Sequence, residues 1–446
     1  MPTAADAGKC ETEEGVREME RYPMDAGGAV QLVTGIREQS PAFLIEYDIM
    51  ETVDRERLLS AVRRALAVFR AFQVKLALTC PDRRPVYARN TREAEVYPCD
   101  GRPHMFGEES GGYLFRVYYA GNRILLSVLH TLTDFFGANE FLKCILCFYF
   151  NIANGQPEEI KRLLAVDPED IRDPYLLYGN PNSPGFSMKN KWHNELFLPN
   201  RMLYRRAEPI RVHELIFSIS DFLTRSNRAE SSIFPFLTWL TGKAVARTYG
   251  GEDRLLTGAG SFNCRGMFHS RTPRCFSQTF PTVLHPRERS MDLSRQLTVQ
   301  RARMDIALEE GTVARSIAAR RAQADAMLKD VGSSILDQER LDAERRASAR
   351  KSTYFLSYLG HIDVGAALDR CIEDVSVLST VTRVPVVVLA YEWRGLLHFR
   401  AQEIGCDNSI APAALEIAGE QGIACTMPAS SVVRLDTFPL EELFHD

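Results

Sequence analysis

The chain has 446 residues, 45% hydrophobic and 25% charged, with a formal net charge of −4, which indicates an ordinary globular protein long enough for two domains. This charge argues against a nucleic-acid-binding protein, which needs a strongly basic face, and no apolar run reaches the roughly 20 residues of a membrane helix. Because the first 20 residues are polar and acid-rich rather than typical of a signal peptide, we expect a cytoplasmic protein without a membrane span.

The N-terminal part of the chain alternates between strand and helix patterns. After a loosely ordered segment at 1–19, apolar residues recur at helical spacing behind Asp54, a typical N-cap residue. Later, two strand patterns are joined by Gly121 and Asn122, a pair that favours a hairpin. The predicted elements are strands at 43–50, 73–78, 85–88, 113–119 and 123–129, and helices at 54–69 and 138–151.

Residues 166–208 are rich in proline, asparagine, tyrosine and serine and show no clear periodicity, which indicates a long crossover loop. A second α/β series follows this loop, and its helical region at 292–350 is expected to break near Gly332. The pattern predicts two lobes, at 20–165 and 209–446, each with a mixed sheet and flanking helices. The predicted elements of the second lobe are strands at 210–219, 255–264, 353–358, 385–393 and 396–402, and helices at 232–249 and 412–420.

The best candidate for a catalytic residue is His130, which directly follows the predicted strand 123–129. A strand holds the first residue beyond its end in a fixed position, and histidine can act as a general base near neutral pH. Asp134 completes an HxxxD pattern, which alone is a weak signal. A buried structural histidine is the alternative for His130, and an N-cap of the next helix is the alternative for Asp134.

The segment RILLSVLHTLTDFFG, which carries this pattern, resembles the HHxxxDG region of CoA-dependent acyltransferases. That superfamily includes condensation domains, chloramphenicol acetyltransferase and alcohol acetyltransferases, and the segment is most similar to the bacterial alcohol-acetyltransferase-like branch. His130 matches the catalytic second His and Asp134 the motif Asp, whereas Leu129 replaces the first His. Phe135 stands where the motif has Gly, and Gly137 matches a second glycine of this branch.

Other segments extend the resemblance over most of the chain. They are ERYP at 20–23, AVFRAFQVKL at 67–76, SFNCRGMFHSRTPRCFS at 261–277 and TYFLSYLGHIDV at 353–364. The resemblance implies two chloramphenicol-acetyltransferase-like lobes with an active-site tunnel between them. It also implies that Asp134 is a structural buttress paired with Arg265, and that Ser357 is an oxyanion donor with Asn263 behind it.

No metal site is predicted, because Cys144 and Cys147 form the one CxxC and no second pair has ligand spacing. The resemblance implies no cofactor but acyl-CoA as co-substrate, and we expect a monomer.

The leading hypothesis is direct transfer of an acetyl or other short acyl group from CoA to a hydroxyl of a small alcohol, lipid or metabolite, with His130 as general base. The alternatives are condensation-type N-acylation and a catalytically degenerate binding or regulatory protein. The latter is suggested by Phe135, Cys275 and Tyr358, which depart from the family motifs.

Overall fold

The computed structural model describes residues 20–34, 42–79, 82, 84–99, 110–152, 172–185, 194–195, 209–228, 232–334, 351–379, 384–404, 406, 408–428, 430–433 and 444. The predicted segment 1–19 and most of the predicted crossover loop 166–208 therefore lie outside the described residues. Within these ranges, no helix is long and apolar enough to cross a membrane.

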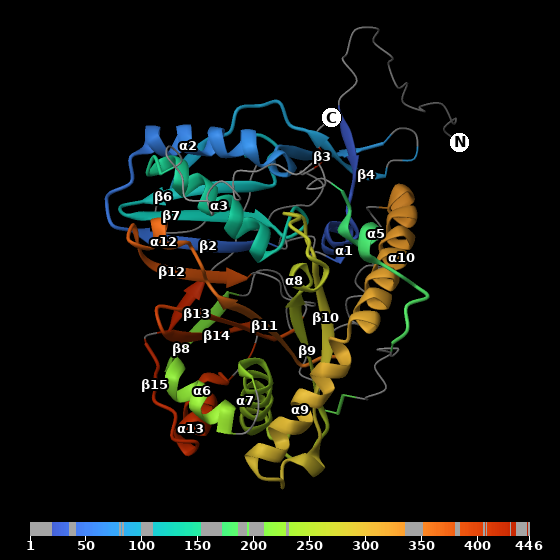
Figure 1. The fold of residues 1–446 in the computed structure, drawn as a ribbon, viewed down its shortest axis with the longest axis vertical. Helices are drawn as coiled ribbons and strands as arrows, with labels where there is room; N and C mark the ends of the chain where they lie inside the picture. The colour runs from blue at the N-terminus through green and yellow to red at the C-terminus, as the bar shows by residue number, and fades with distance from the viewer. Residues whose placement is uncertain are drawn as a thin grey trace, which may run out of the picture.

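The upper half of the molecule in Figure 1 is built on a five-stranded sheet with the order β12-β2-β7-β6-β5. Its strands are β2 (Ala42–Ile49), β5 (Val96–Pro98), β6 (Phe115–Ala120), β7 (Arg123–Leu129) and β12 (Ile372–Ser379). The predicted hairpin at Gly121 and Asn122 is confirmed, because β6 and β7 pair antiparallel up to Ala120 and Arg123. A smaller sheet contains β1 (Arg21–Pro23), β4 (Pro85–Arg89) and β3 (Val74–Leu78).

In the part of the chain that the structure describes, this half contains three longer helices, together with the short η1 (Arg70–Phe72), α5 (Pro174–Tyr178) and α12 (Ala366–Asp369). They are α1 (Ala26–Thr34), α2 (Arg55–Val68) and α3 (Phe135–Tyr149). The carboxylate of Asp54 caps α2 as predicted, by accepting a hydrogen bond from the Arg57 N–H. In α2 the apolar residues Leu58, Leu59, Val62 and Leu66 are buried, as the helical spacing predicts.

The lower half in Figure 1 is built on a larger mixed sheet with the order β10-β9-β11-β13-β14-β8, in which β8 also pairs with β15 and β16. The strands are β8 (Ile210–Ser218), β9 (Leu256–Asn263), β10 (Ser277–Leu284), β11 (Tyr354–His361), β13 (Val386–Trp393), β14 (Leu396–Ile404), β15 (Cys425–Thr426) and β16 (Ser431–Val433). The central strand β11 runs parallel to both of its neighbours, β9 and β13.

The helices of this half are α6 (Ile219–Arg228), α7 (Ile233–Thr248), α8 (Arg265–Phe268), η5 (Pro286–Glu288), α9 (Leu293–Ala307), α10 (Glu310–Ser334) and α13 (Ala411–Glu420). The helix α10 is described as far as Ser334, two residues past Gly332, so the predicted break near Gly332 stays a prediction. A further break, which the sequence did not predict, follows α9, where the Glu309 carboxylate accepts hydrogen bonds from the N–H groups of Gly311 and Thr312 and so starts α10. Figure 1 shows α10 rising from the lower half to lie beside α1 and α5.

Strand β12 joins the two halves. It follows β11 in the chain, yet it pairs antiparallel with β2 at the edge of the five-stranded sheet. The register places Val377 opposite Ile45 and Ser379 opposite Phe43. In consequence, one hydrophobic core contains residues of both halves, whereas a second core belongs to the lower half.

Candidate active site

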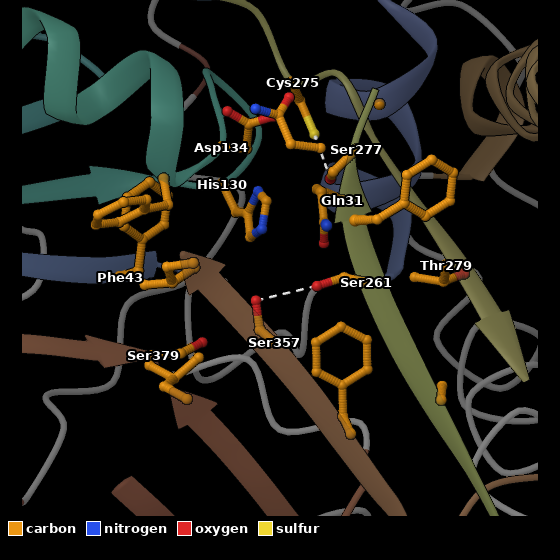
Figure 2. Close-up of a pocket in the computed structure, with 18 of the residues that line it drawn as sticks. Gln31, Phe43, His130, Asp134, Ser261, Cys275, Ser277, Thr279, Ser357 and Ser379 are labelled. Carbon is orange, nitrogen blue, oxygen red and sulfur yellow. Dashed lines mark hydrogen bonds between the residues drawn. The ribbon is translucent and has the colours of Figure 1, made fainter. Parts of the chain in front are cut away.

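His130 lies directly beyond the end of β7. The register of β7 on β2 sets Leu129 opposite Ala42 and Val128 opposite Phe43, which fixes the position of the next residue. The imidazole meets the Phe43 ring edge-on, with 5.3 Å between the ring centroids. Both rings line a cavity of about 230 Å³ that also contains residues of the lower half, as Figure 2 shows.

The turn that follows His130 is held from behind by α1. The Thr131 hydroxyl donates to the Gly28 carbonyl at 2.9 Å, and the Tyr87 hydroxyl donates to the Thr131 carbonyl at 2.6 Å. A Cβ at Gly28 would lie 2.3 Å from the Thr131 oxygen, so only glycine permits this approach. Asp25 accepts from the Gly28 N–H at 2.7 Å and contacts Tyr87, and burial raises the pKa of its carboxyl to about 7.

Asp134 borders the cavity, and its carboxylate is bound by groups of the lower half. Its two carboxylate oxygens each lie 2.9 Å from a guanidinium nitrogen of Arg265, and one of them also accepts from the Phe276 N–H at 2.8 Å. The same carboxylate accepts from the Gly137 N–H at 3.2 Å and so caps α3. Asp134 therefore has both of the features considered from the sequence, since it is an N-cap and it forms the ion pair with Arg265.

Arg265 is positioned by its own neighbours. Its Nε donates to the Thr272 carbonyl at 2.8 Å, and Nη1 donates to Asn263 Oδ1 at 3.0 Å. Nη2 donates in addition to the Arg274 carbonyl at 2.5 Å. Because every nitrogen of the guanidinium is engaged, and its side chain is only 12% exposed, the pair with Asp134 has one orientation.

Gly137, rather than Phe135, occupies the position that requires a glycine. A Cβ at Gly137 would lie 2.1 Å from the Pro273 carbonyl oxygen and 2.2 Å from the Thr133 hydroxyl. Phe135 begins α3 with an ordinary helical backbone, and its side chain lines the cavity. The substitution of the motif glycine by Phe135 therefore does not strain the turn.

Ser357 faces His130 from the lower half, across the cavity (Figure 2). It lies on β11 opposite Ser261 of β9, and the Ser261 hydroxyl donates to the Ser357 oxygen at 3.0 Å. The residue behind Ser357 is therefore Ser261, and Asn263 serves Arg265 instead. Sequence reasoning missed Ser261, although the β-pairing of two predicted strands was the signal that could have revealed it.

The cysteines near the site are not suited to nucleophilic catalysis. Cys275 lines the cavity, but burial raises the pKa of its thiol, with Asp134 and Asp25 acting in the same direction. Cys144 and Cys147 are both buried on α3, as the helical spacing indicates. Among the described residues, no group of His, Cys, Asp and Glu could hold a metal ion.

No protein-family model matches the sequence, and neither does any curated protein. Solved structures are nevertheless similar over nearly the whole chain. TRI101 of F. graminearum, bound to coenzyme A and deoxynivalenol, is 11% identical with a TM-score of 0.62, over 91% of this chain and 99% of that one.

Two further structures have the same architecture. Polyketide synthase associated protein 5 of Mycobacterium tuberculosis has a TM-score of 0.57 at 10% identity, covering 89% of this chain and 96% of its own. The condensation domain of the monacolin K polyketide synthase MokA has a TM-score of 0.56 at 12% identity, covering 91% and 97%. The chain thus has the two-lobed mixed α/β fold of CoA-dependent acyltransferases and condensation domains, and the predicted fold class is confirmed.

Proposed function

We propose that the protein is an acyl-CoA-dependent O-acyltransferase that transfers a short acyl group to the hydroxyl of a small-molecule acceptor. The observation that carries this proposal is the placement of His130 at a rigid strand end, facing the Ser261–Ser357 pair across a cavity between the two halves. Similar structures that hold coenzyme A in the same fold support the choice of donor.

The proposed reaction is a direct transfer. The acceptor oxygen attacks the thioester carbonyl carbon while the neutral imidazole of His130 takes the hydroxyl proton. The carbon–sulfur bond then breaks, and His130 returns the proton to the departing thiolate, which leaves an ester and free CoA. Proton transfer by a positioned histidine contributes about 10²–10⁴ in rate, and holding both substrates in one cavity contributes further.

Ser357 is the proposed donor to the carbonyl oxygen as negative charge develops on it. The Ser261 hydroxyl donates to the Ser357 oxygen at 3.0 Å, so the Ser357 hydroxyl can donate its own hydrogen to another acceptor. A donor fixed in this way before the reaction stabilises the oxyanion without reorganisation. Ser357→Ala is expected to lower kcat by about 10–10³-fold, and Ser261→Ala to lower it less, because Ser261 acts through Ser357.

Asp134 has a positioning role in this proposal. Its carboxylate is engaged by Arg265, Phe276 and Gly137, so it holds the turn that presents His130 and does not relay protons. Asp134→Asn is therefore expected to reduce activity without shifting the pH profile of kcat, whereas a proton relay would shift that profile.

The test is thiol release from acetyl-CoA and longer acyl-CoAs in the presence of pooled alcohols or pooled amines. Wild type is expected to release thiol only when an alcohol is present, and His130→Ala is expected to lose this activity. His361→Ala is the matched control, because His361 is exposed at the end of β11 and does not line the cavity.

Two other results would change the assignment. Turnover with amines alone would indicate N-acylation of the condensation type, with the same base. If wild type bound CoA esters but released no thiol with any acceptor, the proposal would be wrong and a binding or regulatory role would replace it.

A further inference from the structure

The cavity has two chemically different sides, which meet at Ser357. On β11, Ser357 pairs with Ser261 of β9 on one side and with Leu389 of β13 on the other. The side toward β9 and β10 carries most of the polar lining residues, Ser261, Ser277, Thr279 and Arg320, beside the apolar Ala259 and Phe262 of β9. The side toward β13 and β12 carries mainly apolar lining residues, Phe43, Val377, Val384, Val387 and Leu389, with the hydroxyl of Ser379 at the end of β12 as a polar group among them. Figure 2 shows Ser277 and Thr279 on one side of His130 and Phe43 on the other.

The apolar side is enclosed by well-packed side chains. Val377, Val387 and Leu389 line the cavity and are only 2%, 3% and 5% exposed, so little of their surface is open to solvent. Phe43 closes this side next to His130, with its ring 5.3 Å from the imidazole. Hydrocarbon that contacts these side chains is removed from water on the side of the wall.

The outer wall of this apolar side is fixed in place. It consists of β12, whose Val377 carbonyl accepts from Arg400 Nη1 at 2.9 Å and whose Ser379 N–H donates to Gln402 Oε1 at 2.9 Å. On its other edge, β12 is paired with β2. A wall held from two directions cannot move outward to admit a larger group, and it therefore imposes a size limit.

The two ends of an acyl-CoA match the two sides of the cavity. The pantetheine arm carries amides and leads to phosphates, and polar groups lose free energy when they are buried without hydrogen-bonding partners. Hydroxyl side chains and Arg320, which donates to the Thr279 hydroxyl at 3.2 Å, supply such partners on the polar side. The acyl chain is hydrocarbon and has its partners only on the apolar side.

We infer that the apolar side of the cavity, bounded by Val377, Val387 and Leu389, is an acyl-chain pocket that selects a linear aliphatic chain longer than acetyl. This inference rests on the proposed function. Each methylene group that enters the pocket is expected to raise kcat/KM by about fourfold until the chain reaches the β12 wall. The donor class is therefore a linear aliphatic acyl-CoA whose chain is longer than acetyl, within the short acyl groups of the proposed function.

The test compares kcat/KM for acetyl-, propionyl-, butyryl-, hexanoyl- and decanoyl-CoA with one acceptor alcohol. Val387→Phe is expected to fill the pocket and move the preference toward acetyl-CoA, whereas Leu389→Ala is expected to move it toward longer chains. Opposite shifts in two variants cannot come from a general loss of stability. Thr279→Val, on the polar side, is the control and is expected to lower turnover of all donors by the same factor.

Measurements of CoA-ester binding test the inference separately from catalysis. In the His130→Ala background, the affinity for the same CoA esters is expected to rise with chain length by calorimetry, and Val387→Phe is expected to abolish that rise. An affinity and a kcat/KM that are both independent of chain length would overturn the inference and leave the proposed function intact. A change in acceptor preference instead of donor preference in Val387→Phe would assign the pocket to the acceptor. Chain-length-dependent binding without any thiol release would overturn the proposed function alone.

Discussion

The two halves of the molecule are joined on either side of the cavity, and the two junctions are built differently. At one, the turn that presents His130 meets the lower half through the Asp134–Arg265 ion pair and the close approach of Gly137 to Pro273. At the other, β12 passes from the lower half into the upper sheet and pairs along its length with β2. We refer to these as the turn junction and the strand junction.

The turn junction concentrates its stability in a few side chains, whereas the strand junction distributes it over backbone hydrogen bonds. Removal of one side chain should therefore be costly at the first junction and tolerated at the second. The two junctions differ because they have different tasks. The turn junction must hold His130 in one orientation, whereas the strand junction only has to keep β12 in register with β2.

The largest effect is expected for Asp134→Ala, at the turn junction. The substitution leaves the buried Arg265 guanidinium without its carboxylate, so the free energy of unfolding should fall by about 3–5 kcal/mol in urea titrations. The control is Glu420→Ala, which breaks the exposed pair with Arg247 and should cost no more than about 1 kcal/mol. Equal losses in the two variants would remove the distinction between the junctions.

A pH-dependent effect is expected behind the same turn, at Asp25. Burial raises the pKa of its carboxyl to about 7, with Asp173 acting in the same direction and Arg274 against it. Because the pKa is higher in the folded protein than in the unfolded chain, the contribution of Asp25 is most favourable below pH ~4 and is lost as the pH rises to about 7.

Asp25→Asn removes this titration. As the pH rises from 4 to 7, the free energy of unfolding of wild type should fall relative to that of the variant, by on the order of 4 kcal/mol at most. Above pH 7 this difference should stay constant. Paired urea titrations across this range measure the difference, in which the titrations of all other groups largely cancel. A constant difference from pH 4 to 8 would show that Asp25 has an ordinary pKa.

A smaller loss is expected for Gly137→Ala. Its Cβ would lie 2.1 Å from a backbone oxygen of Pro273, so α3 and the segment before Cys275 must move apart, at a cost of about 1–3 kcal/mol. Activity should fall further than stability, because the same turn orients His130. Gly266→Ala is the matched control, because no atom lies within 4 Å of the added Cβ. The free energy of unfolding of this variant should be unchanged or slightly higher than that of wild type.

The smallest effect is expected at the strand junction, for Ser376→Ala. The variant loses the hydrogen bond from Arg400 to the Ser376 hydroxyl, while Arg400 keeps the Val377 carbonyl and β12 keeps its pairing with β2. The expected loss is about 1 kcal/mol in thermal or urea unfolding. Ser431→Ala on the exposed strand β16 should stay within about 0.5 kcal/mol of wild type. A loss above 3 kcal/mol in Ser376→Ala would show that the strand junction also depends on single side chains.

Much of the turn junction could be predicted from the sequence. A run of apolar residues ending at His130 predicts the strand, and the Gly121–Asn122 pair predicts the hairpin that precedes it, since both signals are local. The position of Arg265 came only from the resemblance to known motifs. The structure contains its ion pair with Asp134, whereas the catalytic role of His130 stays a prediction.

The strand junction could not be predicted, because its signals are not local. The alternation of apolar and polar residues in β12 is common to many strands. Nothing in the sequence of 372–379 identifies Phe43 and Ile45 as its pairing partners. The strand β10 and the helix α1 were missed as well. In α1, two adjacent glycines lower the intrinsic helix propensity, and tight packing on Thr131 and Cys275 decides the conformation instead.

The crossing of β12 also bears on the order in which the protein folds during synthesis. Strand β2 can pair with β12 only after residues 372–379 have left the ribosome. During most of translation, the sheet of the N-terminal half therefore has an unpaired edge at β2. Fragments that end before residue 372 should therefore aggregate or bind chaperones, whereas addition of this single strand should restore the pairing of β2.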